Sequence, residues 1–307
     1  RQPRSTLFPY TTLFRSWTPH RQEQLAQIKE VLDEWKDYLP MTLRQVYYQL
    51  VGKGYIENKR SAYSDLSGVI KWSRLDGLIG WDVIEDRTRS LSRRRSDESK
   101  ETFIESEKKY FLKDYSRDLL TSQPNYIEVW IEKDALSSLF ERVCDEYMIP
   151  VVVCRGFSSV SYIRDFVVRA KKRRESGQYI TMLYFGDFDP SGMEMLESMK
   201  ITIKDEFGFP EVNYHRVSLL MEDIHRYNLP HSPKALKESD SRADKFVREY
   251  GRYAVELDAL TPDVLSGKLR EAIEFELDMT MFEKQVEIYQ EELDELRELR
   301  ERVFSNI

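Results

Sequence analysis

Three acidic side chains follow two apolar runs of the chain, and together they could bind a divalent cation. Glu132 comes directly after the apolar residues 126–131, and Asp187 and Asp189 come just after residues 180–185. Both runs are rich in β-branched and aromatic residues, which favours buried β-strands. Because open parallel sheets place ligands at the carboxyl ends of their strands, we expect the three carboxylates to converge there. Hard oxygen ligands without Cys or His suit Mg²⁺, with Mn²⁺ as the alternative ion.

The same residues also have a simpler interpretation as loop carboxylates and helix caps, which Asp and Glu frequently are. Gly186 breaks the second run, and residues 190–192 turn the chain into a helix beginning near Met193. Residues 151–154 supply another strand between the two runs. The acidic residues therefore fall on successive strand–helix units, and this repetition favours a metal site over isolated caps.

A helix over residues 42–54 carries a second set of residues capable of chemistry. Its apolar positions follow a helical spacing and form one face, expected in the core: Leu43, Val46, Tyr47, Leu50 and Val51. Arg44 and Tyr48 lie one turn apart on the neighbouring face, which places a guanidinium beside a phenol. A phenol with a pKa of about 10 is a weak nucleophile, and a cation stabilises its phenolate. Tyr48 is a candidate nucleophile, the simpler alternative being a tyrosine that flanks the core.

The elements around this helix predict a winged-helix domain over residues 17–90. Helices over 21–38 and 61–75 flank it, and residues 77–89 alternate and turn like a β-hairpin wing. Residues 1–16 are left out of the fold, because TLFPYTTLFRS looks like a translated sequencing adapter.

The rest of the chain predicts a second domain, so that the fold class is α/β plus α+β. A basic linker and a connecting helix over 101–120 occupy 91–122. An α/β domain with a parallel sheet and a loop extension, punctuated by Pro and Ser over 227–246, follows at 123–255. Acidic helices occupy 256–307.

Residues 125–217 resemble the Toprim domain, the metal-binding α/β module of topoisomerases, primases and OLD-family nucleases. The shared pattern is a Glu after the first strand, here Glu132, and Asp-x-Asp after a later one, here Asp187 and Asp189. A winged helix with Arg-x-x-x-Tyr followed by Toprim resembles the A subunit of type IIB topoisomerases (topoisomerase VI) and the related meiotic double-strand-break protein.

This second resemblance implies a reaction. Tyr48 would attack a DNA phosphodiester and leave a covalent 5′-phosphotyrosyl link, with Arg44 and Glu132 as the other catalytic residues. The Toprim metal, held by Glu132, Asp187 and Asp189, would act from the partner subunit of a homodimer. The chain has no P-loop and no glycine-rich ATP lid, so any ATP dependence needs a separate ATPase subunit. Such an enzyme is expected in the cytoplasm of a prokaryote, encoded by the cell, a phage or a mobile element.

The charge distribution predicts where double-stranded DNA would bind. The net charge is −7, yet residues 42–95 hold eleven Lys and Arg against six Asp and Glu, whereas residues 256–307 hold fifteen acids against six bases. The predicted DNA contacts lie on the third helix, the wing and the chain before them: Lys59, Arg60, Lys71, Arg74, Arg87 and Arg89. No stretch is long and apolar enough to span a membrane.

Several alternatives remain open at the level of sequence. In one, the Toprim site hydrolyses DNA directly and Tyr48 is structural, as in OLD-family nucleases. In the others, the chain is a non-catalytic DNA-binding factor or a primase-like polymerase. Glu256 and Asp258 form either a second acidic cluster near the metal or a capping and salt-bridge arrangement. The last helix repeats Phe282, Tyr289 and Leu296 every seven residues, which suits either a dimer seam or packing onto its own chain.

Overall fold

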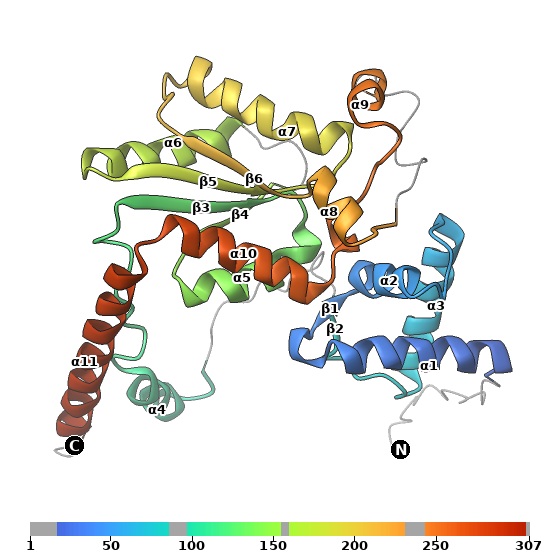
Figure 1. Ribbon diagram of the computed structural model, residues 1–307. Helices are drawn as coiled ribbons and strands as arrows, with labels where there is room; N and C mark the ends of the chain where they lie inside the picture. The colour runs from blue at the N-terminus through green and yellow to red at the C-terminus, as the bar shows by residue number, and fades with distance from the viewer. Residues whose placement is uncertain (1–16, 86–96, 155–159, 231–242, 305–307) are drawn as a thin grey trace, which may run out of the picture.

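A four-stranded parallel sheet forms the centre of the molecule, in a computed structural model that describes residues 17–85, 97–154, 160–230 and 243–304. The strands are β3 (Asn125–Ile131), β4 (Val151–Val153), β5 (Tyr179–Phe185) and β6 (Asn213–Ser218). Their order in the sheet is β4-β3-β5-β6 (Figure 1). The two predicted strands that precede the acidic residues are therefore confirmed, and they are direct neighbours, with Ile131 opposite Phe185.

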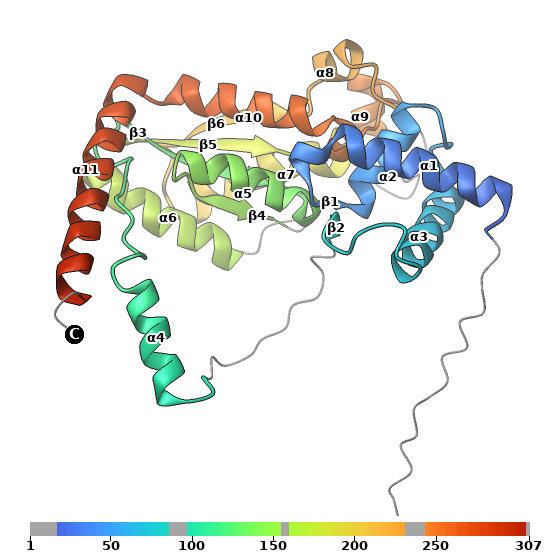
Figure 2. The same cartoon turned by 90° about the horizontal axis from the view of Figure 1, so that it is seen from below.

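Helices cover both faces of this sheet, as the apolar character of its strands requires. On one face Ile127, Val129 and Ile131 pack with α5 (Ser137–Glu146) and α10 (Pro262–Glu276). On the other face Tyr126 and Trp130 pack with α6 (Val160–Glu175) and α7 (Pro190–Ile201). Figures 1 and 2 show these two helical layers with the sheet between them. A short helix η2 (Asp134–Leu136) leads from β3 into α5.

The N-terminal part contains the three predicted helices in the predicted order. They are α1 (Pro19–Glu34), which is followed by a 3-10 turn η1 (Lys36–Tyr38), α2 (Leu43–Gly52) and α3 (Arg60–Leu75). Thr42 and Gln45 form a capping box that fixes the start of α2. Gln45 and Tyr48 are buried together with the expected apolar face, because α2 contacts α1 on one side and η5 (Leu257–Ala259) on another.

The predicted hairpin wing takes a different form in its described part. Strand β2 (Ile84–Glu85) pairs in parallel with β1 (Met41–Thr42) instead of folding back on a neighbouring segment. The chain between α3 and β2 is a turn in which Ile79 is buried. The second half of the predicted wing, with Arg87 and Arg89, lies outside the described residues.

Three predicted boundaries are corrected. The connecting helix α4 (Lys100–Tyr110) ends ten residues before the predicted position 120, and Leu112 has a φ of 61° that no right-handed helix accommodates. Helix α7 begins at Pro190 rather than near Met193, because Pro is well tolerated in the first turn. In the loop predicted over 227–246, the chain after α8 (Met221–Arg226) forms helix α9 (Ala243–Tyr250), in which the buried Phe246 provides an anchor that the sequence pattern did not reveal.

The C-terminal helix α11 (Met279–Phe304) packs back onto its own chain. Its Glu292 accepts hydrogen bonds from Tyr115 at 2.6 Å and from Arg117 at 2.5 Å, and the rings of Phe282 and Tyr147 lie 5.6 Å apart. The described part of the chain therefore favours the fold-back alternative for this heptad seam. A short π-helical turn (Thr202–Glu206) completes the described elements. No helix among residues 17–85, 97–154, 160–230 and 243–304 has the length and hydropathy of a membrane span.

Candidate functional site

A single ammonium group joins three carboxylates at the carboxyl edge of the sheet. Lys133 follows the last residues of β3, and its Nζ lies 3.0 Å from Asp187, 2.7 Å from Glu256 and 2.5 Å from Asp258. The Lys133 side chain is 12% exposed and that of Asp258 is fully buried. Burial disfavours the ammonium form, but the three carboxylates outweigh it and hold the pKa of Lys133 well above its ordinary value.

The predicted metal ligands Glu132 and Asp187 lie at neighbouring strand ends. The Glu132 carboxylate accepts a hydrogen bond of 2.9 Å from the backbone N–H of Asp187, and the N–H of Leu257 donates to Asp187 at 2.7 Å. Burial, together with the charges of Glu132 and Asp258, raises the pKa of Asp187 to about 7, although Lys133 opposes the shift. Burial and the charge of Asp189 also raise the pKa of Glu132. The carboxylates therefore repel one another, which favours a cation among them.

Asp189 serves as the N-cap of α7, so for this residue the capping interpretation is confirmed. Its carboxylate accepts a hydrogen bond of 2.7 Å from the backbone N–H of Gly192. Gly192 is needed at this position because a Cβ would lie 2.3 Å from the Asp187 carbonyl oxygen and 3.0 Å from a Glu132 carboxylate oxygen. The turn thus brings the backbone of α7 close to the Glu132 and Asp189 carboxylates.

The three predicted metal ligands have the chemistry that a divalent cation requires, but they are not arranged as a metal-coordination site. Glu132, Asp187 and Asp189 offer hard oxygen ligands of the kind Mg²⁺ prefers, and burial, followed by the charges of neighbouring carboxylates, raises the pKa of Glu132 and of Asp187. Within the described ranges no group of three His, Cys, Asp or Glu side chains is arranged to hold a metal ion. Lys133 occupies one Asp187 oxygen, so a bound cation would have to share or replace that contact.

Arg216, which the sequence did not predict as a site residue, binds the backbone of the loops that form this site. Its guanidinium donates hydrogen bonds to the carbonyls of Gly186, Asp187, Gly192 and Leu219. Burial lowers the pKa of Arg216 from its ordinary value, while neighbouring carboxylates and Tyr184 oppose the shift. The sequence held one signal of this role, the arginine within strand β6, because a buried arginine is rarely found without several hydrogen-bond acceptors.

Helix α2 reaches this cluster through Glu256. Arg44 Nη1 lies 2.8 Å from a Glu256 oxygen that also contacts Lys133, and the Tyr48 phenol donates a hydrogen bond to the same carboxylate. Tyr48 is 7% exposed, and burial, followed by the charge of Glu256, raises its pKa well above the ordinary value, while Lys133 opposes this. The network places Arg44 and Tyr48 next to the predicted metal ligands within one chain.

The predicted partner of the Tyr48 phenol is therefore replaced by a carboxylate. Arg44 was expected to lie beside the phenol, but its guanidinium forms an ion pair with Glu256. The open question about Glu256 and Asp258 is also answered: they form a salt-bridge arrangement, and it adjoins Asp187. Local sequence could not show this, because the contacts join segments more than a hundred residues apart.

Tyr47 behaves as the sequence predicted. It is 4% exposed, and its ring packs edge-on against Tyr48 and Tyr63, each at 5.2 Å between ring centroids. Its hydroxyl contacts the Asn58 side chain at 3.2 Å and the Lys59 carbonyl at 3.3 Å. Tyr47 is thus a core residue with a satisfied hydroxyl and a suitable control for Tyr48.

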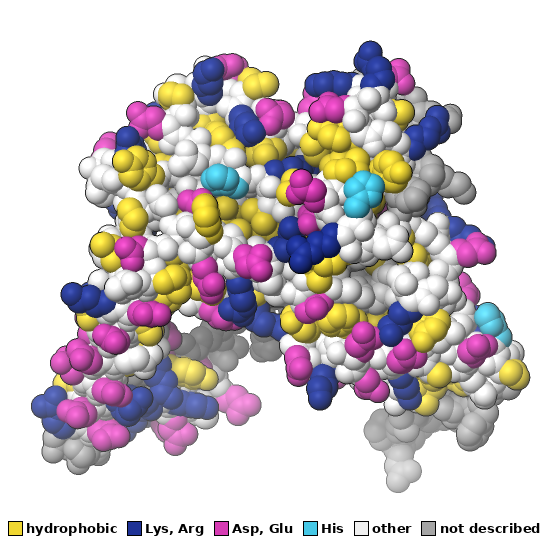
Figure 3. Space-filling model, viewed as in Figure 1, with side chains coloured by type: hydrophobic (Ala, Val, Ile, Leu, Met, Phe, Trp, Pro, Cys, Tyr) yellow, Lys and Arg dark blue, Asp and Glu magenta, His cyan; other side chains and the backbone are white. Residues whose placement is uncertain are grey.

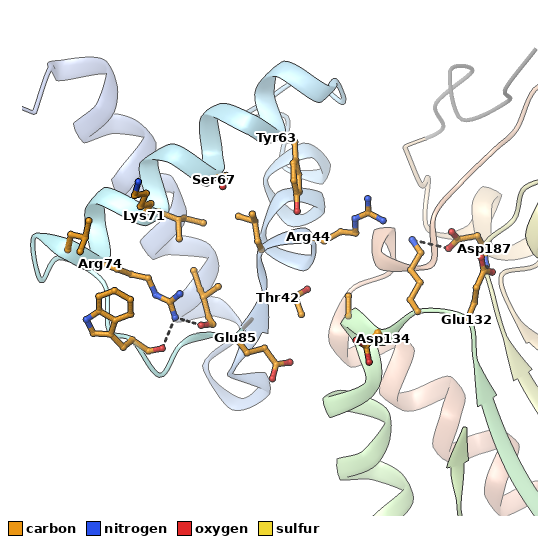
Figure 4. A pocket seen from close by; sticks show the side chains of 17 residues that line it. Thr42, Arg44, Tyr63, Ser67, Lys71, Arg74, Glu85, Glu132, Asp134 and Asp187 are labelled. Atoms are coloured by element: carbon orange, nitrogen blue, oxygen red, sulfur yellow. Dashed lines mark hydrogen bonds and ion pairs between the residues drawn. The ribbon is translucent and has the colours of Figure 1, made fainter. Parts of the chain in front are cut away.

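A cavity of about 980 Å³ connects helix α3 with the carboxylates. One wall comes from α2 and α3, and the other from the segment after β3 and from Asp187 (Figure 4). Its lining includes three of the predicted catalytic or DNA-binding cations and two of the predicted metal ligands: Arg44, Lys71, Arg74, Glu132 and Asp187. These five residues therefore face a common space, whereas Tyr48 and Asp189 do not line the cavity.

The predicted DNA contacts differ in their surroundings. Lys71 lines the cavity, and its Nζ lies 4.7 Å from the centre of the Trp72 ring. Arg74 donates hydrogen bonds to the backbone carbonyls of Trp81 and Ile84, so it anchors a turn rather than offering a free guanidinium.

The remaining predicted contacts lie before α3 or beyond β2. Lys59 is paired with Glu57 at 2.6 Å, and Arg60 is exposed at the start of α3. Arg87 and Arg89 fall in the part of the chain for which no structure is described.

Comparison with protein-family models, with curated proteins and with solved structures finds no match for this chain. The interpretation of the site therefore depends on its own residues and geometry.

Proposed function

We propose that this chain cleaves DNA strands by tyrosine transesterification, in the manner of a topoisomerase VI A subunit, with Mg²⁺ or Mn²⁺ bound by Glu132, Asp187 and Asp189. One observation carries the proposal. Tyr48 and Arg44 share the Glu256 carboxylate with Lys133, and Lys133 contacts Asp187, so the candidate nucleophile and the candidate metal ligands belong to one continuous network.

The proposed reaction assigns a task to each residue of that network. The Tyr48 oxygen gives up its proton and forms a bond to phosphorus while the bond from phosphorus to the 3′-oxygen breaks. The 3′-oxygen takes up a proton from solvent, which yields a 5′-phosphotyrosyl link and a 3′-hydroxyl end. Glu256 already accepts the phenolic hydrogen bond and orients the hydroxyl. Arg44 and Lys133 supply positive charge that stabilises the phenolate and the developing charge on the phosphate. A bound divalent cation adds Lewis-acid stabilisation of the phosphoryl oxygens.

The proposed reaction also implies a substrate, partners and a location. The substrate is double-stranded DNA, met by the exposed cations Arg60 and Lys71 of α3. A homodimer, a separate ATPase subunit and a cytoplasmic location in a prokaryote remain parts of the proposal that come from the family resemblance.

Direct hydrolysis of DNA by the carboxylate site is the second candidate, and a specific observation favours it. The Tyr48 phenol is buried, donates to a carboxylate and has a raised pKa, and each of these features opposes its ionisation. Under this alternative Tyr48 is a structural donor to Glu256, and water attacks the phosphodiester.

Neutralising the metal ligands tests both candidates against a non-catalytic DNA-binding role. Glu132→Gln and Asp187→Asn preserve shape but remove charge, so we expect them to abolish plasmid cleavage in Mg²⁺ and to leave DNA affinity nearly unchanged. Glu85→Gln, which changes another carboxylate that lines the cavity, should retain cleavage. Parental cleavage rates in Glu132→Gln or Asp187→Asn, or cleavage that persists in EDTA, would exclude the proposed metal site.

A further inference from the structure

An exposed tryptophan stands on the wall of the cavity. Trp81 lies in the turn between α3 and β2, lines the cavity, and is 66% exposed. Leu75 and Leu78 nearby are 54% and 36% exposed, so this end of α3 presents apolar side chains to solvent. A large aromatic ring left this open beside a cavity is available for a ligand, because most Trp surface is buried in folded proteins.

Hydrogen bonds and buried side chains fix the turn that carries Trp81. Arg74 places its guanidinium 5.1 Å from the ring centre and donates a hydrogen bond of 2.6 Å to the Trp81 carbonyl. Ile79 and Ile84 are buried on either side, and β2 is paired with β1. The ring is therefore presented on a fixed support, which lowers the entropic cost of binding a ligand to it.

The remainder of the cavity is suited to an anionic chain. Lys71 lines it from α3 and Arg44 from α2, and Figure 4 shows Arg44 directed toward Asp187. An aromatic surface at one end and cations along the wall match a nucleotide, with its base on the ring and its phosphate beside the cations. A volume of about 980 Å³ accommodates a short stretch of one strand rather than a double helix.

We propose that this wall binds an unpaired segment of DNA, with one nucleobase stacked on Trp81 and its backbone directed along Lys71 toward the carboxylates. Bases within a duplex are stacked on one another, so only an unpaired base can lie on the ring. The inference deepens the proposed strand cleavage, on which it rests, by naming locally unpaired DNA as the preferred substrate.

Binding measured without metal tests this inference. In EDTA, fluorescence anisotropy would compare a labelled oligothymidylate with a labelled blunt-ended duplex that has no unpaired loop, each titrated with the full chain. Trp81→Ala should weaken binding of the single strand by about 5- to 150-fold, the equivalent of the roughly 1–3 kcal/mol of a base–aromatic stack. Trp81→Phe should retain most of the affinity, and duplex binding should be unchanged in both variants.

The matched control is Phe275→Ala, which removes an even more exposed aromatic ring, 84% exposed, from α10 and outside the cavity lining. It should bind both probes as the parent does. Equal losses for single strand and duplex in Trp81→Ala, or an undiminished affinity for the single strand, would overturn the inference. A parent that shows the expected discrimination but cleaves no DNA in Mg²⁺ refutes the cleavage proposal alone, whereas a cleaving parent whose Trp81→Ala variant binds normally refutes only the stacking site.

Discussion

Lys133 is the residue on which the site's electrostatics depend. One ammonium serves Asp187, Glu256 and Asp258 at 3.0 Å or less, so negative charge exceeds positive charge even before Glu132 is counted. Breaking a buried ion pair leaves uncompensated charge, which is costlier than the pair itself is stabilising. We therefore expect the site to respond to an added divalent cation.

Replacing this ammonium provides a binding test that needs no enzymatic activity. Lys133→Met should lower stability by about 3–5 kcal/mol in EDTA, because the buried Asp187 and Asp258 lose their counter-charge and the half-buried Glu256 keeps only Arg44. Mg²⁺ should then raise the melting temperature of the variant more than that of the parent, since the cation takes the place of the ammonium. Differential scanning calorimetry with and without Mg²⁺ measures both effects.

The matched control is Lys268→Met, which also breaks a half-buried ion pair, with Asp223 at 2.7 Å, but elsewhere in the fold. It should be destabilised without a gain in its response to Mg²⁺. An identical Mg²⁺ response in Lys133→Met and Lys268→Met would contradict cation binding at the Asp187 cluster.

At the scale of elements, the loop from β5 into α7 positions the site. The beginning of this loop could be predicted from the sequence, because the apolar runs and the acidic residues at their ends mark β3 and β5. The contacts that hold the loop in place could not be predicted, because Arg216 binds its backbone carbonyls from the more distant strand β6. The same limit applies to the parallel pairing of β1 with β2 and to the contact of α2 with η5, which depend on residues distant in sequence.

Two glycine substitutions separate a tight backbone approach from ordinary helix propensity. Gly192→Ala should destabilise the protein and abolish its response to Mg²⁺, because the new Cβ would meet the Asp187 carbonyl at 2.3 Å and displace the loop. Gly267→Ala in α10 meets open space and should stabilise by about 0.5–1 kcal/mol. Urea unfolding of both variants, with and without Mg²⁺, measures the difference; a Gly192→Ala variant as stable and as responsive as the parent would exclude the close approach.

At the scale of the whole molecule, the two parts of the chain share one core. A single cluster of buried residues extends from Ile28 in α1 to Phe282 in α11, and α2 contacts η5 within it. Arg44 and Tyr48 therefore meet the carboxylate site of their own chain, whereas the topoisomerase resemblance implies a metal from the partner subunit. Of the acidic C-terminal helices, α11 lies at the end of the molecule opposite α3, and α10 runs along the sheet from α11 toward α2 (Figure 1).

The distribution of charge over the molecule provides a test of the proposed DNA binding. Despite the net charge of −7, the surface in Figure 3 interleaves both signs, so local cations govern the contact with phosphates. Lys71→Ala should weaken binding to all duplexes alike and reduce the log–log salt dependence by about 0.9, the value for one phosphate contact. Lys172→Ala on α6, across the sheet, is the control. A salt dependence unchanged in Lys71→Ala would place the DNA on another face.

The phenolic oxygen of Tyr48 provides the most direct test of the account. Tyr48→Phe removes this oxygen and one hydrogen bond to Glu256, at a cost of about 0.5–1.5 kcal/mol, so the fold should persist. Tyr47→Phe is the control, because the Tyr47 hydroxyl forms its hydrogen bonds with residues 57–59 and none with the carboxylates of the site in the described part of the chain. Denaturing gels of end-labelled duplex after incubation with Mg²⁺ should show protein linked to 5′ ends for the parent and for Tyr47→Phe, and no linked protein or strand breakage for Tyr48→Phe. Free 5′-phosphate ends produced by Tyr48→Phe at the parental rate would contradict transesterification and establish hydrolysis in its place.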